Sequence, residues 1–274
     1  MGILDDMSYE TAIYYLLHGV IAPTPLFLVA FTVATSFLTL LAVSCYLHRS
    51  QTHRSVYFIW PVNFVFRTIL WLFTGMKTIE WVSVHRKHHA KCDTPEDPHS
   101  PKYFGLKKIL LEGADIYQKA GRNNPELLRE YGEGTPNDWF ERNLFNGRNT
   151  LGVAITLVVE LVLFGLPALI IWPIQMLVIP IIAAGFINGI AHVWGYQRYK
   201  DGELKENGKV FERIGGALNV PTYGLAVGEE FHNNHHAYQE RYKFSHAWYE
   251  LDIAGTLIEL MTWIGFAWVP RKKN

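Results

Sequence analysis

Three long runs of apolar residues dominate the hydrophobic pattern of this chain. Residues 25–47 and 173–193 contain no charged side chain, and residues 151–172 contain only Glu160. A helix that crosses a bilayer needs about 20 predominantly apolar residues. The pattern therefore predicts three membrane-spanning helices over these ranges, with Pro167, Trp172 and Pro173 marking the turn between the second and third.

Three further stretches are apolar but do not fit a simple span. Residues 56–79 carry Arg67 near their centre, where an arginine costs about 2.5–3.5 kcal/mol on insertion scales. We therefore predict that this stretch returns or lies at the interface. Residues 244–269 mix apolar and acidic side chains, which is typical of a helix lying on a surface. Residues 8–23 enter the membrane only if a fourth span is present.

Charge is distributed unevenly along the chain. All 25 lysines and arginines follow position 48, and an excess of basic residues marks the cytoplasmic side of a membrane protein. We expect an all-α membrane bundle of three to four spans that carries a cytosolic helical cap. The whole chain, residues 1–274, is predicted to be one domain, with the cap formed by residues 48–149 and 194–274.

Composition excludes several classes of protein. Apolar residues make up 49% of the chain, which is too much for a disordered protein. The 25 basic residues only balance the 25 acidic ones, so no excess charge is present to neutralise the phosphates of a nucleic acid. Two cysteines are too few for a disulfide scaffold or a typical iron–sulfur cluster.

Histidine is the unusual residue, because most of the 12 histidines lie in three short clusters. The clusters are His48 with His53, then residues 85–89 (HRKHH), then residues 232–236 (HNNHH). Residues three or four apart share a helix face, which aligns the rings of the second and third clusters. The same rule pairs Asn188 with His192. A spacing of five, as in the first cluster, fits a helix that loosens where it leaves the membrane.

Neutral imidazole is the commonest metal ligand in proteins and suits iron, zinc, copper and nickel. Nine rings exceed the needs of one tetrahedral ion, so we expect two metal ions with room for water or dioxygen. Residues 54–84 are too short for two crossings, which need about 40 residues, so the clusters share one side of the membrane. Within the three histidine clusters, only Glu229 and His232 match the Glu-x-x-His pair of carboxylate-rich di-iron bundles.

These motifs together resemble the three histidine boxes of the membrane fatty acyl desaturases, most closely the acyl-CoA type. The resemblance covers residues 25–252 and rests on the following segments: His48-Arg-x-x-x-His53-Arg54, Glu80-Trp81-x-x-x-His85-Arg-x-His88-His89, Asp97-Pro98-His99, Asn188-x-x-x-His192 and Gly228-Glu229-x-x-His232-Asn-x-His235-His236.

The resemblance implies a small helical membrane bundle under a cytosolic cap that holds two irons. Animal members of the family have four spans, whereas three clear spans are visible here. Carried over position by position, the iron ligands would be His48, His53, His85, His88, His89, His192, His232, His235 and His236, with Asn188 acting through a water molecule. Neither the resemblance nor the spacing divides these ligands between the two irons.

The implied activity is oxygen-dependent desaturation of a long acyl chain carried by CoA, acyl carrier protein or a membrane lipid. Acidic side chains are expected to orient the imidazoles, and Trp81 to contact the substrate. The candidate acids are Glu80, Asp93, Asp97, Glu229 and Glu230. The chain has no dinucleotide fingerprint, so an external donor must supply electrons: a ferredoxin, a rubredoxin, or cytochrome b5 with its reductase.

Two alternative functions remain open from the sequence. A hydroxylase or acetylenase of the same di-iron superfamily would use the same histidines. A non-enzymatic membrane protein that binds haem or another metal belongs to a different class. We favour a bacterial inner membrane over the endoplasmic reticulum, with a cytoplasmic site. Arg49, Arg54 and Arg86, which lie beside the clustered histidines, are interpreted as interfacial residues. An isolated histidine such as His99 is interpreted as an incidental surface residue.

Overall fold

The computed structural model of this protein describes residues 8–203, 205, 207–211 and 214–270. Its elements in chain order are α1 (Tyr9–His18), α2 (Pro25–Ala42), η1 (Val43–Thr52), β1 (Tyr57–Phe58), α3 (Trp60–Phe73), α4 (Thr78–Lys91), α5 (Pro101–Phe104), α6 (Leu106–Gly121), α7 (Pro125–Tyr131), η2 (Glu141–Phe145), α8 (Asn149–Phe164), α9 (Ala168–Ile179), η3 (Pro180–Ile187), η4 (Ile190–His192), α10 (His232–Ala237), α11 (Ile253–Trp263) and β2 (Ala267–Trp268).

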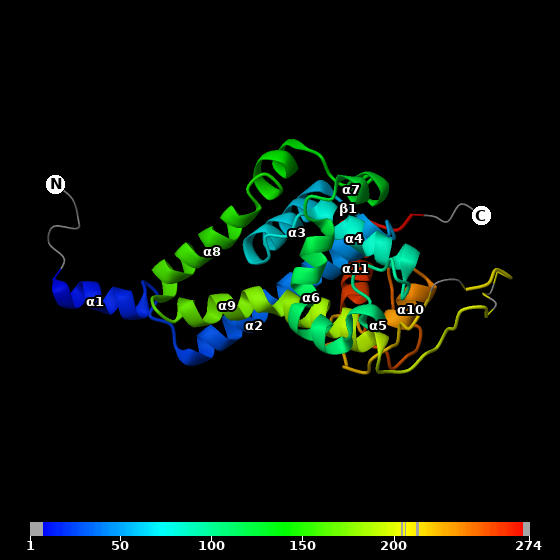
Figure 1. Cartoon of the computed structure of the whole chain (residues 1–274). Coiled ribbons are helices and arrows are strands. Elements are labelled where there is room, and N and C mark those ends of the chain that lie inside the picture. Colours follow the sequence, from blue (N-terminus) through cyan, green and yellow to red (C-terminus); the bar gives the residue numbers. More distant parts are fainter. Residues whose placement is uncertain (1–7, 204, 206, 212–213, 271–274) are drawn as a thin grey trace.

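The molecule has two ends of different character. Helices α2, α8 and α9 extend to one side, with α1 beyond their far end, while α4, α6, α10 and α11 gather at the other (Figure 1). The predicted helical bundle with a helical cap is confirmed, apart from one antiparallel pair of two-residue strands, β1 and β2.

Within the described part of the chain, two continuous helices are long and apolar enough to cross a membrane. They comprise residues Pro25–Thr52, formed by α2 and η1, and Ala168–His192, formed by α9, η3 and η4. Helix α8 has 16 residues and is therefore about 24 Å long, somewhat shorter than a bilayer core. It lies beside the other two and completes the narrow half of the molecule.

The turn between the second and third apolar runs lies at Pro167, the first of the three predicted positions, and not at Trp172 or Pro173. Helix α8 ends before Gly165, whose φ of 67° is a left-handed conformation that favours glycine. A Cβ at Gly165 would lie 2.7 Å from the backbone N of Gly19, so the close approach of the α1 segment also requires glycine. Pro173, expected at the boundary, lies inside α9, because a membrane helix tolerates an internal proline that its neighbours accommodate.

Arg67, the arginine within the apolar stretch 56–79, lies on helix α3. This helix has only 14 residues, fewer than a span needs, and Arg67 is buried in an ion pair with Asp138 and Glu141. The arginine donates to both oxygens of Asp138, over 2.7 and 2.9 Å. The apolar face of α3 therefore packs inside the protein, and its charge is neutralised there by the segment that includes η2.

The cap is attached tightly to the end of the second long helix. Helix α6 packs on η3 at Gly113, where a Cβ would lie only 2.7 Å from the carbonyl oxygen of Ala184. The predicted surface helix near the C-terminus is α11, which begins after the N-cap Asp252 and buries Ala254, Gly255 and Ile258. The main apolar core surrounds η1, so the first histidine cluster lies on the best-packed part of the chain.

Candidate metal centre

The first cluster lies on η1, a segment of π-helix at the end of the first long helix. The backbone N–H of His53 donates to the carbonyl oxygen of His48 over 3.2 Å, which is the i→i+5 hydrogen bond of a π-helix. The wider turn brings two histidines five residues apart to the same side. Helix α4 carries the second cluster, with His85, His88 and His89 buried on one face.

The third cluster lies on α10, a six-residue helix held by buried asparagines. The side-chain oxygen of Asn219 accepts hydrogen bonds from the backbone N–H groups of Asn233 and Asn234, over 3.0 and 3.2 Å. Asn234 in turn donates to Glu250 over 2.9 Å. The two asparagines of the HNNHH sequence thus anchor the helix, while its histidines join the other clusters.

The structure brings five histidines into one group, called here the five-histidine group: His48, His53, His85, His89 and His235. Four of their Nε2 atoms form a closed ring, in the order 48, 235, 89 and 85, with successive separations of 2.9, 3.0, 3.0 and 2.9 Å. A square with this edge has its centre about 2.1 Å from each corner, which is the usual length of a bond between metal and imidazole nitrogen. The centroid of the His53 ring lies 4.6 Å from the ring centroids of His89 and His235.

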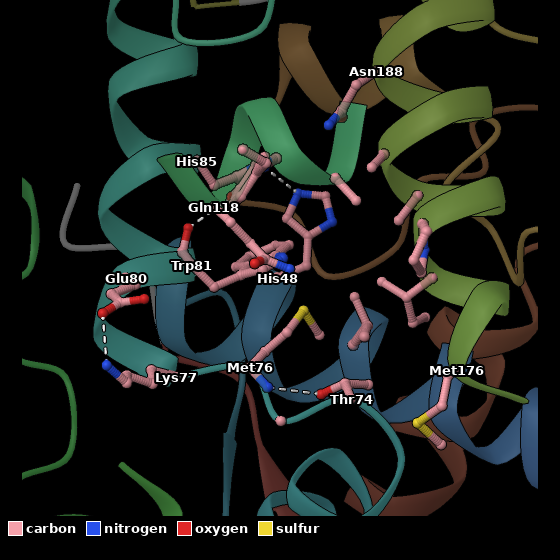
Figure 2. A pocket seen from close by; sticks show the side chains of 18 of the residues that line it. His48, Thr74, Met76, Lys77, Glu80, Trp81, His85, Gln118, Met176 and Asn188 are labelled. Atoms are coloured by element: carbon pink, nitrogen blue, oxygen red, sulfur yellow. Dashed lines mark hydrogen bonds and ion pairs between the residues drawn. The ribbon is translucent and has the colours of Figure 1, made fainter. Parts of the chain in front are cut away.

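The other four histidines form a second group, the four-histidine group: His88, His192, His232 and His236. The Nε2 atoms of His192 and His232 are 2.9 Å apart, and those of His88 and His236 are 3.4 Å apart. Cys92 also lies beside this group, but its Sγ points to the carbonyl oxygen of Ile214 at 3.6 Å. Asn188 is buried and, like His232, lines the cavity that Figure 2 shows.

The protonation state of these rings fits a metal site. The pKa values of His85, His89 and His235 lie well below 6.5, because burial and then the neighbouring imidazoles oppose a positive charge. Neutral rings direct nitrogen lone pairs at one another, and two lone pairs cannot form a hydrogen bond. The buried Nε2 of His53, the fifth ring of the five-histidine group, also has no protein partner. Metal cations would satisfy the converging nitrogens, so this donor set fits two transition-metal ions.

One carboxylate orients a ring of the five-histidine group. Glu229 accepts from Nδ1 of His48 over 2.5 Å, which turns the other ring nitrogen toward the centre of the group. Burial raises the pKa of Glu229, but the interaction with His48 and the positive charge of Arg49 have the larger combined effect and lower it to about 2. Glu229 is therefore ionised at neutral pH and favours the tautomer that leaves Nε2 free for a metal.

Two aspartates orient rings of the four-histidine group. Asp97 accepts from Nδ1 of His88 over 2.9 Å, and Asp93 from Nδ1 of His192 over 3.3 Å. Burial again opposes ionisation, but the interaction with His88 lowers the pKa of Asp97 to about 2. The pKa of Asp93 is lowered as well, because its hydrogen bond with His192 and its other donors outweigh burial.

The remaining predicted side chains have other surroundings. Glu230 does not orient a ring through its carboxylate, which instead accepts from the backbone N–H groups of Gly224 and Gly228 over 2.6 and 2.7 Å. Glu80 is paired with Lys77 at 2.9 Å. Trp81 stacks on His85, with ring centroids 4.8 Å apart and planes 17° apart.

The interpretation of Arg49 as an interfacial residue is wrong. Its side chain is completely buried, donates to Glu229 over 2.7 Å and to Asp252 over 2.9 Å, and lies 3.6 Å from the ring centroid of Phe244. Arg86 also turns inward, where its guanidinium binds backbone carbonyls such as those of Gln51 and Tyr131. The sequence feature that could have indicated the buried role of Arg49 and Arg86 is that each directly follows a candidate histidine ligand.

The interpretation of His99 as a surface residue is also wrong. It is buried and stacks on His88, with centroids 4.3 Å apart. On its other side it faces Tyr117, with centroids 5.3 Å apart. Tyr117, which the sequence did not single out, donates its hydroxyl to the carbonyl oxygen of Trp81 over 2.7 Å. The Asp97-Pro98-His99 motif was the available signal for this packing.

A cavity of about 600 Å³ extends from the histidines toward α8 and α9, in the half of the molecule that holds the long apolar helices. Figure 2 shows His48, His85, Trp81 and Asn188 around one space, with Thr74, Met76 and Met176 farther from the histidines. Apolar side chains from η1, α8, α9 and η3 line the rest: Val43, Val153, Met176, Ile179, Pro180, Ala183, Ala184 and Ile187. The cavity can hold an extended apolar chain beside the candidate metal ligands.

Comparison with known proteins agrees with this geometry. The family model for fatty acid desaturases matches residues 23–259. The chain is 27% identical to a palmitoyl-monogalactosyldiacylglycerol delta-7 desaturase of Arabidopsis thaliana, over 83% of this chain and 57% of that protein. It is 26% identical to the delta-9 acyl-lipid desaturase 2 of the same plant, over 83% and 69%, and 30% identical to its delta-9 desaturase-like 2 protein, over 86% and 74%.

The chain therefore spans little more than half the length of some curated relatives that it matches. The family match nevertheless covers most of the described residues, including all three histidine clusters and both long helices. This protein belongs to the fatty acid desaturase family.

Proposed function

We propose that this protein is an oxygen-dependent desaturase that introduces a double bond into a long acyl chain and uses two iron ions. One observation carries the proposal: a single cavity is lined by His48, His85 and His232 at one end and by apolar side chains at the other. The family membership and the names of the relatives support the same reaction.

The five-histidine group would hold one iron, and the four-histidine group, with Asn188 through a water molecule, would hold the second. The reaction needs such a cofactor, because the C–H bonds of an unactivated methylene resist side-chain acids and bases, and iron with dioxygen supplies the oxidant. The ligands are rings without charge, so the carboxylates that accept from Nδ1 of His48, His88 and His192 supply the negative charge beside them.

The protein's own residues position the substrate. Trp81 stacks on His85 and lines the cavity, so it provides a flat apolar wall beside the ring. Met176 and Ile179 from α9 and Val153 from α8 also line the cavity. These side chains fix the path of an extended chain and exclude water from it, so one pair of carbons is held nearest to the histidines.

We propose that the acyl carrier is a membrane lipid. The cavity reaches the surface at Gln118 and Arg122, which are exposed, and close to Asn149 at the start of α8. Lys77 is neutralised by Glu80 there, which leaves the opening the single positive charge of Arg122 for the several phosphates of a CoA ester. Its position beside a membrane helix suits a lipid that enters from the bilayer, as the names of two relatives also suggest.

We further propose that the histidine end faces the cytoplasm of a bacterial inner membrane, that residues 1–274 act as a single domain, and that a ferredoxin, a rubredoxin or cytochrome b5 with its reductase supplies electrons. The crowding of basic residues after position 48 supports the orientation.

The test is expression in a host of known lipid composition, followed by mapping of double bonds in each lipid class. We expect new monounsaturated chains that first appear in a membrane lipid, and no product from His235→Ala protein inserted at the same level. Hydroxylated or acetylenic chains would instead identify the related activities. Product that appears first in the acyl-CoA pool would contradict the proposed carrier.

A further inference from the structure

One buried acid lies far from the histidines, in the membrane half of the molecule. Glu160 is the only charged residue of α8 and has 2% of its surface exposed. Neither oxygen of its carboxylate has a hydrogen-bond partner. An ionisable side chain inside a membrane helix is expensive to keep and needs a partner or a function.

The polar neighbour of Glu160 is Gln175, which comes from α9 and is almost completely buried. The Nε2 atom of Gln175 donates to the hydroxyl of Thr35 on α2 over 2.9 Å, while its Oε1 atom has no partner. The Thr35 hydroxyl in turn donates to the carbonyl oxygen of Phe31 over 2.9 Å. Three helices therefore meet at one small polar cluster surrounded by apolar side chains.

A proton on Glu160 would supply a donor for the one amide atom of this cluster that otherwise has none, Oε1 of Gln175. An ionised Glu160 could accept from the second N–H of Gln175 Nε2, but Oε1 would stay without a donor, and the surroundings cannot hydrate a charge. A protonated Glu160 has one hydroxyl donor, which matches the unpartnered Oε1. The hydrogen bonds then run in one direction, from Glu160 through Gln175 and Thr35 to the backbone of α2.

We propose that Glu160 is a neutral carboxylic acid that, with Gln175 and Thr35, clamps α8, α9 and α2 together and thereby fixes the deep wall of the cavity. Gln175 is followed by Met176, which lines the cavity, and Val153 lines it two turns before Glu160. A second polar contact fastens the same region, because the indole N–H of Trp172 donates to the carbonyl oxygen of Val153 over 3.1 Å.

The clamp limits the length of acyl chain that the cavity accepts, an inference that rests on the proposed desaturase function. The space between α8 and α9 limits how far an acyl chain extends beyond the histidines. Glu160, Gln175 and Thr35 are thus positioning residues for chain length, acting through Met176 and Val153 rather than by touching the substrate.

Infrared spectroscopy and thermal unfolding of the purified full chain test the clamp without any activity. We expect a carbonyl stretching band of a protonated, buried carboxyl at neutral pH, and its loss in Glu160→Gln protein. The glutamine keeps a donor for Oε1 of Gln175, so the melting temperature of Glu160→Gln should stay within about 2 °C of the wild type, whereas Glu160→Leu should lower it by roughly 2–4 °C.

The chain-length profile of the products tests the positioning role. Glu160→Leu should change the ratio of long to short products at least about two-fold, and Glu160→Gln should leave it unchanged. Thr156→Val is the matched control, because Thr156 on α8 donates to the carbonyl oxygen of Leu72 on α3 and not toward α9. It should lower the melting temperature but leave the ratio unchanged.

Two results would overturn the proposal. Absence of the protonated-carboxyl band would show an ionised Glu160, as expected for the opposite orientation of the Gln175 amide. Equal destabilisation by Glu160→Gln and Glu160→Leu would show that the hydrogen bonds contribute nothing. Loss of all product with the infrared band intact would instead count against the desaturase function alone.

Discussion

The two histidine groups are built in different ways. The ligand candidates of the five-histidine group lie on η1, α4 and α10, with His53 directly after η1, and one carboxylate, Glu229, orients a ring in the group. The four-histidine group depends on a loop as well, because Asp93 and Asp97 lie after α4 and each accepts from a ring nitrogen. The first group is thus positioned mainly by helix packing and the second mainly by buried carboxylates.

The largest effect should come from removing one ring from each group. His235→Ala opens the ring of four Nε2 atoms, and His236→Ala removes a member of the four-histidine group. We expect both to abolish product and each to lose about one metal ion per chain while the other group keeps its ion. Metal analysis of the purified variants checks this, and loss of both ions from either variant would show that the groups are not separate sites.

Acidification should destabilise the metal-free protein strongly. Six rings have pKa values well below 6.5 in the folded state, namely His53, His85, His89, His232, His235 and His236. The unfolded chain binds protons at these rings below pH 6.5 and the folded chain does not, so stability falls as pH falls through that value.

The loss of stability should appear between pH 7.5 and pH 5.5, which lie on either side of the ordinary pKa of histidine. Thermal unfolding in detergent measures it. Four of the six rings belong to the five-histidine group, so most of the loss arises there. The exposed His18 is the control, and His18→Gln should not change the pH profile. A flat profile for the metal-free wild type would contradict the neutral rings.

Breaking the buried ion pair beside the five-histidine group should cost less. Arg49→Met leaves Glu229 and Asp252 without their cation, and removal of one partner of a buried pair costs about 3–5 kcal/mol. Denaturant unfolding checks this. Arg54→Met is the matched control, because Arg54 is exposed and its removal should stay within about 0.5 kcal/mol. Equal effects would show that Arg49 does not organise this region.

The smallest expected effect concerns the carboxylate beside the four-histidine group. Asp97→Asn keeps the shape of the side chain but removes the charge that favours the His88 tautomer. Replacement of such a partner typically costs about 10–100-fold in metal affinity. Competition with a chelator should show this loss at one of the two sites only. Glu96→Gln, at an exposed neighbour, should leave both affinities unchanged.

The sequence predicted the histidine clusters and the helical bundle because both depend on local patterns. Spacings of three and four residues align the rings of α4, and long uncharged runs predict the membrane helices. It did not predict how the histidines divide. His88 and His89 are adjacent yet belong to different groups, and that separation depends on where α10 and η4 meet α4, which is a tertiary property.

The errors also have physical reasons. Pro173 looked like a helix boundary, but the turn is formed by Gly165, where the close contact with Gly19 admits no side chain. Arg49 looked like an interfacial residue because its partners lie far away in the sequence, at Glu229 and Asp252. Long-range pairing of this kind leaves no periodic pattern to read.

Metal analysis of the full chain, purified in mild detergent and supplied with iron, tests the central claim most directly. The account predicts two iron ions per chain, no haem absorption, and loss of one ion in the His235→Ala variant. A single ion per chain, a preference for zinc, or a haem spectrum would contradict the assignment of the two histidine groups to a di-iron centre.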